Sequence, residues 1–346
     1  MTQKEETSIL VLYTGGTIGM MKDPDTGALV PFDFENIYKH LPMLGNLCYR
    51  LDFYSFDPLI DSSNMNPEFW AMLATKIEEN YEKYDGFVVL HGSDTMAYTA
   101  SALSFMLENL GKPVVLTGSQ LPMGEVRTDG RENFLAAIEI AAAKENDLSV
   151  VPEVCIFFQD KLLRGNRTTK FNAEDFNAFT STNYPLLADV GVHIKYNKER
   201  ILKPTFKKLK LHTQMDPNVG ILKLFPGISP DFVRHALNTP NLKGLVLETF
   251  GSGNATTAPW FLEALKEATD KGLIILNITQ CQGGSVEMGR YETSLEMSRI
   301  GVVSGYDMTA EAAVAKLMYL IGEGQPREKI LELLPLPIRG ELTLLD

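Results

Sequence analysis

Short apolar runs that alternate with helix-forming stretches are the feature that most constrains the fold of this chain. Runs rich in Val, Ile, Leu and Phe predict strands at residues 8–13, 86–91, 113–117 and 153–158. Helices are expected between them at about 67–83, 96–110 and 130–144. The first of these begins after Asn66 with a proline at its first position, a typical helix start. Such alternation predicts an α/β fold with a doubly wound, mostly parallel sheet.

The alternation stops between about 195 and 217 and then resumes. This stretch carries seven basic residues and, up to position 215, a single acid, Glu199: Lys195, Lys198, Arg200, Lys203, Lys207, Lys208 and Lys210. Such a run is more typical of a solvated linker than of a partner site. Later strands are expected at 219–225, 244–250, 273–279 and 301–304, with helices near 230–238, 257–271, 309–322 and 326–334. We therefore expect a larger N-terminal domain at 1–195, a linker at 196–217 and a smaller C-terminal α/β domain at 218–346.

Charge and composition exclude several classes of protein. The net charge of −12 argues against binding to nucleic acid or to an anionic membrane, because both require a basic surface. No uncharged apolar run approaches the roughly 18 residues that span a bilayer, and the polar N-terminus has no room for a signal peptide. Cys48, Cys155 and Cys281 are too far apart to suggest disulfides or a zinc cluster. These features favour a cytoplasmic protein.

Polar motifs follow three of the predicted strands, at the point where each strand ends. They are residues 14–19 (Thr-Gly-Gly-Thr-Ile-Gly), 91–95 (His-Gly-Ser-Asp-Thr) and 117–120 (Thr-Gly-Ser-Gln). The carboxyl ends of parallel strands meet at one edge of a sheet, where ligands bind. We therefore expect the three loops to converge on one site that carries hydroxyls, glycines and an aspartate.

The first loop resembles a phosphate-binding loop only superficially. It lacks both the Gly-x-Gly-x-x-Gly order and the Lys-Ser/Thr ending of a P-loop. Tight glycines at Gly15 and Gly16 instead let backbone N–H groups approach a ligand, and Thr17 supplies a hydroxyl nucleophile beside them. A backbone N–H near that hydroxyl is able to stabilise an oxyanion.

The second loop supports two interpretations. Ser93 and Asp94 place a hydroxyl beside a carboxylate at a strand end, a combination that binds an amine and positions a water molecule. The same residues, with Thr95, are also typical of the N-cap of a helix that begins at position 96. Both hold if Thr95 caps the helix while Asp94 points into the site.

Two further segments carry weaker signals. Asp61, Ser62 and Ser63 lie in a long connection, where serine is common in any case. Lys170 ends the segment 164–170 (Arg-Gly-Asn-Arg-Thr-Thr-Lys). A lysine that is partly buried against a carboxylate passes a proton near neutral pH, whereas most lysines are simply solvated.

Taken together, these motifs resemble the bacterial asparaginase family, and most closely its cytoplasmic type I branch. The segments that carry the resemblance are residues 13–19, 91–98, 117–120 and 164–170, in that order, and it extends to residues 339–343 near the end of the chain. It implies an L-asparagine amidohydrolase that forms aspartate and ammonia. By motif, Thr17 would be the nucleophile that forms an acyl-enzyme.

The resemblance also implies roles for the other motif residues. Ser93, Asp94 and Lys170 would form a second catalytic group, in which the hydroxyl handles water or proton transfer, the lysine relays the proton and the aspartate orients it. Asp94 would also hold the substrate's α-amino group. The α-carboxylate end would be bound by Ser62, with Asp61 and Ser63 beside it. Neither a metal nor an organic cofactor is implied. The family assembles as dimers of close pairs in which the second domain closes a neighbour's site, so a homodimer or homotetramer is expected.

Three positions depart from the family pattern. Ser93 stands where threonine is usual, and residues 25–30 lack the tyrosine that is common after the first motif. Some type I members bind a second asparagine as an activator, and the matching positions here are Thr169, Asn254 and Cys281. However, Glu248 replaces an arginine that grips the activator's carboxylate, and the reversed charge disfavours an anion. We therefore expect this regulation to be weak, altered or absent.

Two alternatives remain at the level of sequence. One is the related amidotransferase subunit that frees ammonia from glutamine for a tRNA-dependent reaction. That protein carries an additional domain before the first motif, whereas here the first strand begins at Ser8. The other is a non-enzymatic amino-acid sensor of two α/β lobes, which would use Asp94 and Ser62 but would not need Thr17 together with Lys170.

Overall fold

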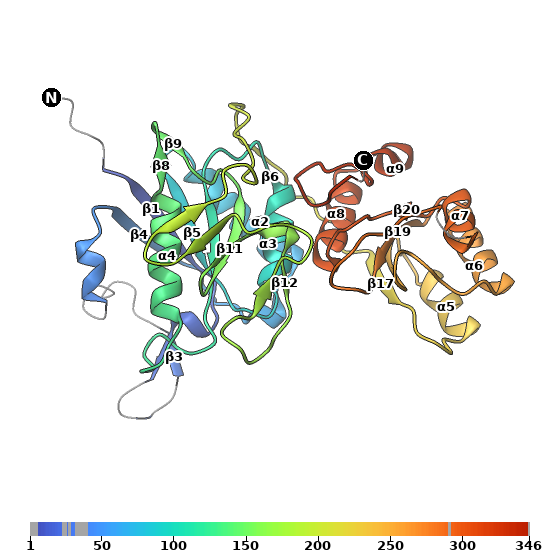
Figure 1. Ribbon diagram of the computed structural model, residues 1–346, viewed down its shortest axis with the longest axis horizontal. Helices are drawn as coiled ribbons and strands as arrows, with labels where there is room; N and C mark the ends of the chain where they lie inside the picture. Colours follow the sequence, from blue (N-terminus) through green and yellow to red (C-terminus); the bar gives the residue numbers. More distant parts are fainter. Residues whose placement is uncertain (1–5, 23–25, 27–28, 32–40, 290–291, 345–346) are drawn as a thin grey trace. The chain divides into compact units, whose positions relative to one another are not determined.

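The computed structural model describes residues 6–22, 26, 29–31, 41–289 and 292–344 (Figure 1). It contains two compact units, Met1–Leu211 and His212–Asp346. Residues 25, 27 and 28 of the segment 25–30, which lacks the tyrosine common in the family, lie outside the described residues. No helix within the described part of the chain is long and apolar enough to cross a membrane.

The first unit is built on an eight-stranded sheet with the order β15-β14-β11-β10-β7-β5-β1-β4. Its parallel strands are β1 (Ser8–Tyr13), β4 (Arg50–Ser55), β5 (Gly86–Leu90), β7 (Val114–Thr117) and β10 (Val154–Phe158). Three antiparallel strands extend one edge: β11 (Lys161–Arg164), β14 (Ala188–Val190) and β15 (Ile194–Tyr196). The expected doubly wound, mostly parallel sheet is confirmed. The chain order of the parallel strands reverses at β1 and β5, which neighbour each other in the sheet.

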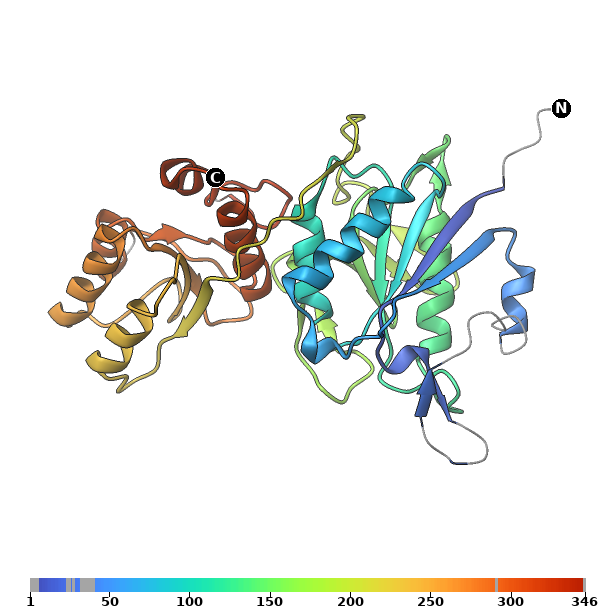
Figure 2. The same cartoon turned by 180° about the vertical axis from the view of Figure 1, so that it is seen from behind.

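Helices cover both faces of this sheet, as the uniformly buried central strands require. Helix α4 (Gly130–Ala142) packs on one face (Figure 1), and α3 (Met96–Met106), with α2 (Pro67–Glu79) beside it, lies on the other (Figure 2). The Asn66 side chain accepts a hydrogen bond from the Phe69 N–H, so the predicted start of α2 is confirmed. Helix α3 is buried along most of its length, as its small and apolar composition predicts.

Short elements complete the first unit. They are β2 (Met20–Lys22), β3 (Leu29–Pro31), β6 (Leu107–Glu108), β8 (Lys144–Glu145), β9 (Leu148–Ser149), β12 (Thr169–Lys170), β13 (Phe179–Thr180), β16 (Lys210–Leu211) and the 3₁₀ turns η1 (Thr17–Gly19), η3 (Pro42–Asn46), η4 (Ser62–Asn64) and η5 (Gly165–Arg167). The expectation of a helix to residue 110 is wrong. Helix α3 ends at Met106 because the next two residues pair, as β6, with β16 a hundred residues further along the chain.

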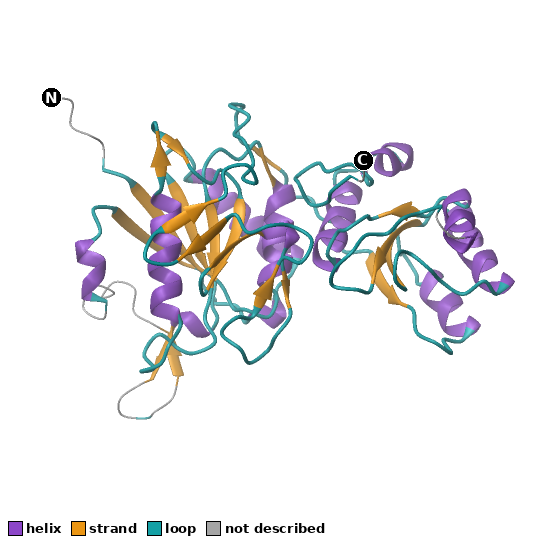
Figure 3. Ribbon diagram, viewed as in Figure 1, coloured by secondary structure: helices purple, strands orange, loops and turns teal. Residues whose placement is uncertain are grey.

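The second unit contains a four-stranded parallel sheet with the order β17-β18-β19-β20. Figure 3 distinguishes its strands from its helices by colour. Its strands are β17 (Val219–Lys223), β18 (Gly244–Thr249), β19 (Ile274–Thr279) and β20 (Val303–Ser304). One face packs against α5 (Pro230–Leu237) and α6 (Pro259–Asp270), with α7 (Glu292–Arg299) next to α6. The other face packs against α8 (Ala310–Gly322), which is followed by α9 (Arg327–Leu333). The smaller α/β domain is thus confirmed, although the polar helix α7 was not expected from the sequence.

Candidate active site

The loops after β1, β5 and β7 leave the same edge of the sheet. Tyr13, Leu90 and Thr117, the last residues of these strands, lie in register across the sheet. The Thr14 N–H donates to the Leu90 carbonyl (3.0 Å), and the Ile60 N–H donates to the Thr14 carbonyl (2.8 Å). These bonds place the segment before η4 beside the first loop. Because the strand order reverses between β1 and β5, the loops meet at the position where open α/β sheets bind ligands.

Glycines allow these loops to touch. Gly16 has a φ of +91°, and a Cβ built on it would lie 2.5 Å from the Gly92 Cα. Gly15 has a φ of +133°, and a Cβ there would lie 2.2 Å from the Ile60 carbonyl oxygen. A Cβ on Gly92 would in turn lie 2.6 Å from the Ser62 Oγ. The backbones approach too closely for any side chain, so glycine is required at the centre of the site.

Thr17 begins the 3₁₀ turn η1 directly after Gly16, and it is half-buried. The buried Tyr13 hydroxyl donates to the Gly19 carbonyl (3.0 Å) and thereby supports this turn. Burial raises the pKa of Tyr13 to about 12, so this phenol remains a neutral donor. Within the described part of the chain, no hydrogen bond engages the Thr17 hydroxyl.

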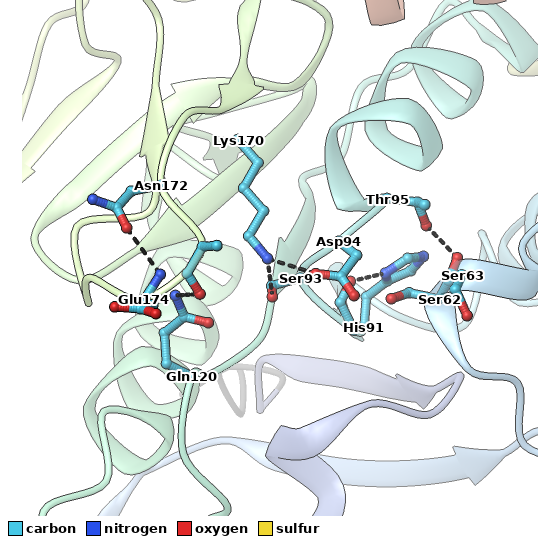
Figure 4. Close-up of polar contacts among 12 residues, drawn as sticks. Ser62, Ser63, His91, Ser93, Asp94, Thr95, Gln120, Lys170, Asn172 and Glu174 are labelled. Atoms are coloured by element: carbon cyan, nitrogen blue, oxygen red, sulfur yellow. Dashed lines mark hydrogen bonds and ion pairs between the residues drawn. The ribbon is translucent and has the colours of Figure 1, made fainter.

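Lys170 links the hairpin of β12 and β13 to the loop after β5. Its Nζ donates to the Ser93 Oγ (2.9 Å) and lies 2.6 Å from the Asp94 Oδ1 (Figure 4). The lysine side chain is only 15% exposed, whereas that of Asp94 is 68% exposed. The hairpin of β12 with β13, in which Lys170 pairs with Phe179, supplies the lysine. The structure therefore brings together the hydroxyl, the carboxylate and the amine that lie 77 residues apart in sequence.

Ser62 lies at the first position of η4 and is 4% exposed. Its Oγ has no hydrogen-bond partner among the described residues, although it faces Gly92. Asp61 accepts hydrogen bonds from both the Ser63 N–H and the Ser63 hydroxyl, each at 2.9 Å. These two bonds lower the pKa of Asp61, so it stays ionised. The serine hydroxyl at 63 is thus occupied, whereas that at 62 has no partner among the described residues.

Thr95 does not cap helix α3 in the way the sequence suggests. It occupies the N-cap position, but its side chain makes no capping hydrogen bond. The hydroxyl instead donates to the Ser62 carbonyl at 2.7 Å. This bond ties the loop after β5 to η4, and it was not foreseen because the two segments are 33 residues apart.

Gln120 is a positioning residue that the sequence analysis included only as part of a motif. Its side-chain amide donates to the carbonyls of Ala173 (3.2 Å) and Asp175 (2.9 Å). The Asn172 Oδ1 accepts hydrogen bonds from two following backbone N–H groups in the same loop (Figure 4). The loop after Lys170 is thereby fastened to the end of β7. An asparagine two residues before an acidic pair is a turn signal that could have indicated this loop.

Arg164 anchors the segment that leads to Lys170. Its Nε lies 2.7 Å from the Glu153 Oε2, and both side chains are almost fully buried. One guanidinium nitrogen also donates to the Arg200 carbonyl at 2.7 Å. A buried pair of this kind is destabilising to break, because either partner alone would be an uncompensated charge.

The residues expected to bind a second ligand are distributed over both units. Thr169 lies in β12 of the first unit, whereas Asn254 and Cys281 belong to the second. The carboxylate of Glu248 lies 3.6 Å from the Lys223 Nζ, with 15% of its side chain exposed. Cys281 is exposed. The described residues contain no cluster of three or more His, Cys, Asp or Glu that could hold a metal ion.

Comparison with known proteins places these features in context. Residues 8–202 match the family model described as "Asparaginase, N-terminal", and residues 218–334 match the "Glutaminase/Asparaginase C-terminal domain". The chain is 42% identical to L-asparaginase 1 of Escherichia coli (strain K12), with 98% of this chain and 99% of that protein covered. It is 45% identical to the 60 kDa lysophospholipase of Mus musculus, with 98% of this chain and 63% of that protein covered. The crystal structure of L-asparaginase I from Vibrio cholerae superimposes with a TM-score of 0.88 at 41% identity, covering 98% of this chain and 99% of that one.

Proposed function

Because the chain belongs to the asparaginase family, we propose that it hydrolyses L-asparagine to L-aspartate and ammonia, with Thr17 as the nucleophile. The observation that carries this proposal is the contact of Lys170 with both Ser93 and Asp94, at the sheet edge where Gly16 packs on Gly92. A sensor protein would need a carboxylate and a serine to bind an amino acid. It would not need an amine held between a hydroxyl and a carboxylate.

The reaction proceeds in two steps. The Thr17 oxygen attacks the carbon of the side-chain amide, the C–N bond breaks, and the nitrogen leaves as ammonia with the proton lost by the hydroxyl. The resulting ester is then attacked by water, which returns a proton to Thr17 and releases aspartate. Ser93 and Lys170 form the proton path beside the ester, and Asp94 holds the lysine at 2.6 Å. Backbone N–H groups of the glycine-lined turn stabilise the oxyanion.

Complementary groups hold the amino-acid end of the substrate. The available Ser62 hydroxyl donates to the α-carboxylate, and the exposed carboxylate of Asp94 attracts the α-ammonium group. Asp61 remains ionised and would repel a carboxylate, so its part is to fix η4 through Ser63. Ser63 accordingly supports η4 through its hydrogen bonds to Asp61.

Three further properties belong to the same proposal. We propose that the reaction needs neither a metal nor an organic cofactor, since the nucleophile, the proton path and the carboxylate are all side chains of this chain. The protein would assemble as a homodimer or as a dimer of dimers, as its family membership suggests. We also propose a cytoplasmic location. Residues 1–195 would form the catalytic domain, 196–217 a linker and 218–346 the second domain.

Ammonia release from L-asparagine tests this function. We expect Thr17→Ala to lower kcat by about 10³-fold or more, because the bond-forming oxygen is lost, while Thr17→Ser retains measurable turnover. Thermal unfolding of each variant controls for folding. A fall of only about tenfold, equivalent to 1.4 kcal/mol, would assign the nucleophile elsewhere, with Ser93 the next candidate.

Two other substrates accompany asparagine in this assay. L-glutamine differs by one methylene, for which discrimination is typically roughly 10–200-fold. A lysophospholipid is included because one relative is named a lysophospholipase. Turnover of the lysophospholipid without turnover of asparagine would contradict the proposed amide hydrolysis.

A further inference from the structure

A chain of three buried hydrogen bonds lies behind the loop that carries Ser93 and Asp94. The Trp70 Nε1 lies 2.9 Å from the Thr99 Oγ1, which lies 2.9 Å from the His91 Nε2. The His91 Nδ1 lies 2.6 Å from the Gly92 carbonyl oxygen. His91 and Thr99 are completely buried, and Trp70 is 5% exposed. The function proposed above assigns no part to any of these three side chains.

The chemistry of the partners determines where each proton lies. An indole N–H only donates, so Thr99 accepts from Trp70. A carbonyl only accepts, so the His91 Nδ1 carries the proton and donates to Gly92. In the neutral ring the His91 Nε2 is then an acceptor, and it receives the Thr99 hydroxyl proton. Every donor in the chain has one acceptor, and both ring nitrogens are engaged, so neither is available to a substrate.

The carbonyl that His91 holds belongs to the residue at the centre of the site. Gly92 is packed between Gly16 and Ser62, and its peptide group leads directly into Ser93. A trans peptide is planar, so a carbonyl turned towards the imidazole directs the Ser93 N–H the opposite way. The orientation of this one peptide therefore decides whether Ser93 and Asp94 both reach Lys170, at 2.9 and 2.6 Å.

We propose that His91 is a positioning residue for amide hydrolysis. The hydrogen bond from its Nδ1–H to the Gly92 carbonyl, with Nε2 held by Thr99, orients the Gly92–Ser93 peptide and thereby aligns the hydroxyl and carboxylate with Lys170. The expected effect on kcat rests on the proposed function, whereas the tautomer of His91 is independent of it. The role differs from that of a general base, because the imidazole acts only through the backbone.

Helix α3 offers a matched set of variants to test this. Thr99→Val keeps the side-chain shape and removes the hydroxyl, and Thr99→Ser restores it. Ser101 lies on the same helix, and its buried hydroxyl has no hydrogen-bond partner among the described residues, so Ser101→Ala is the control. We expect Thr99→Val to lower kcat about 10- to 100-fold, because Ser93 and Lys170 are no longer held in alignment. Thr99→Ser and Ser101→Ala should stay near the wild-type kcat.

Substitutions at His91 itself distinguish the two ring nitrogens. His91→Asn places an amide donor close to the position of Nδ1, whereas His91→Gln places it close to that of Nε2. We expect kcat of His91→Asn to exceed that of His91→Gln by about tenfold or more. Melting midpoints show which variants remain folded, and kcat is compared only among those.

Nitrogen-15 NMR of the five histidines provides a readout that needs no turnover. The ring of His91, assigned through His91→Asn, should show a protonated Nδ1 and an unprotonated Nε2. A protonated Nε2 would overturn the inference, as would a Thr99→Val enzyme with the kcat of Ser101→Ala. Failure of the wild type to hydrolyse asparagine would overturn the proposed function and the positioning role with it. The NMR measurement of the His91 tautomer would still test the hydrogen bonds among Trp70, Thr99, His91 and Gly92.

Discussion

At the scale of single residues, burial decides which side chains of the site are charged. Burial lowers the pKa of His91 to about 4, although its bond to the Gly92 carbonyl opposes this shift. The imidazole is therefore neutral at physiological pH, as its hydrogen bonds require. Asp61 shows the opposite case, because hydrogen bonds from Ser63 lower the pKa of an exposed carboxyl and keep it ionised. A neutral imidazole and an ionised carboxylate are thus maintained by different physical causes.

The lowered pKa of His91 predicts a loss of stability in mild acid. Below pH 6.5 the unfolded chain binds a proton at His91, whereas the folded chain does not bind it until about pH 4. The free energy of unfolding therefore decreases as the pH is lowered. The contribution is fully present above pH 6.5, and about 2 kcal/mol of it should be lost between pH 7 and pH 5. Urea unfolding of the wild type and of His91→Asn at both pH values measures this. Equal pH dependence in the two proteins would contradict the prediction.

At the scale of elements, strand ends and the glycines after them build the site. The strands end in register at Tyr13, Leu90 and Thr117, which brings the three loops to one edge. Hydrogen bonds from Thr95 to Ser62 and from Gln120 to the loop after Lys170 then fasten the loops to one another. Since these bonds join loops rather than strands, the arrangement of the site depends on loop packing that the sheet alone does not determine.

A single methyl group at Gly16 should disrupt this packing. Gly16→Ala would put a Cβ 2.5 Å from the Gly92 Cα at a φ of +91°, so one of the two loops must move. We expect kcat to fall about 100-fold or more, together with a lower melting midpoint. The matched control is Gly45→Ala, where the added Cβ meets nothing within 4 Å and φ is not positive. If both variants turn over alike, the close approach of the two loops is not required for catalysis.

At the scale of the whole molecule, the two units carry different candidate ligand groups. The first holds Thr17 and its neighbours, and the second holds Asn254, Cys281 and Glu248. In the second unit Glu248 is paired with Lys223 at 3.6 Å, so this position presents a partly neutralised carboxylate where an activator's anionic end would need a cation.

Regulation by a second asparagine is therefore expected to be weak, altered or absent. The rate should follow a hyperbola in asparagine concentration, since no cation at position 248 receives a second carboxylate. Calorimetric titration of Thr17→Ala should also give one asparagine bound per chain, because this variant retains Ser62 and Asp94. Sigmoidal kinetics, or a second saturable site in the titration, would show that Glu248 does not prevent activation.

The sequence by itself determined the alternating architecture of this protein and the strands β1, β5, β7 and β10 of the large sheet, but it did not predict β4, β11, β14 or β15 of the same sheet. Strands β1, β5, β7 and β10 are apolar runs bounded by turn residues, and α2 begins at a local capping signal. Such signals act between near neighbours, so they can be interpreted without knowledge of the fold. Motifs at predicted strand ends likewise indicated where the loops with Thr17, Ser93 and Asp94 would lie.

Only the tertiary structure decided features that depend on residues far apart in the chain. Helix α3 stops at Met106 because β16 pairs with the following residues, and the Thr95 hydroxyl turns to Ser62 instead of capping its helix. The His91 Nε2 is engaged by Thr99 of α3, which in turn accepts a hydrogen bond from Trp70 of α2. In each case the local preference is worth about 1 kcal/mol, and a long-range hydrogen bond or strand pairing of similar size overrides it once the fold has brought the partners together.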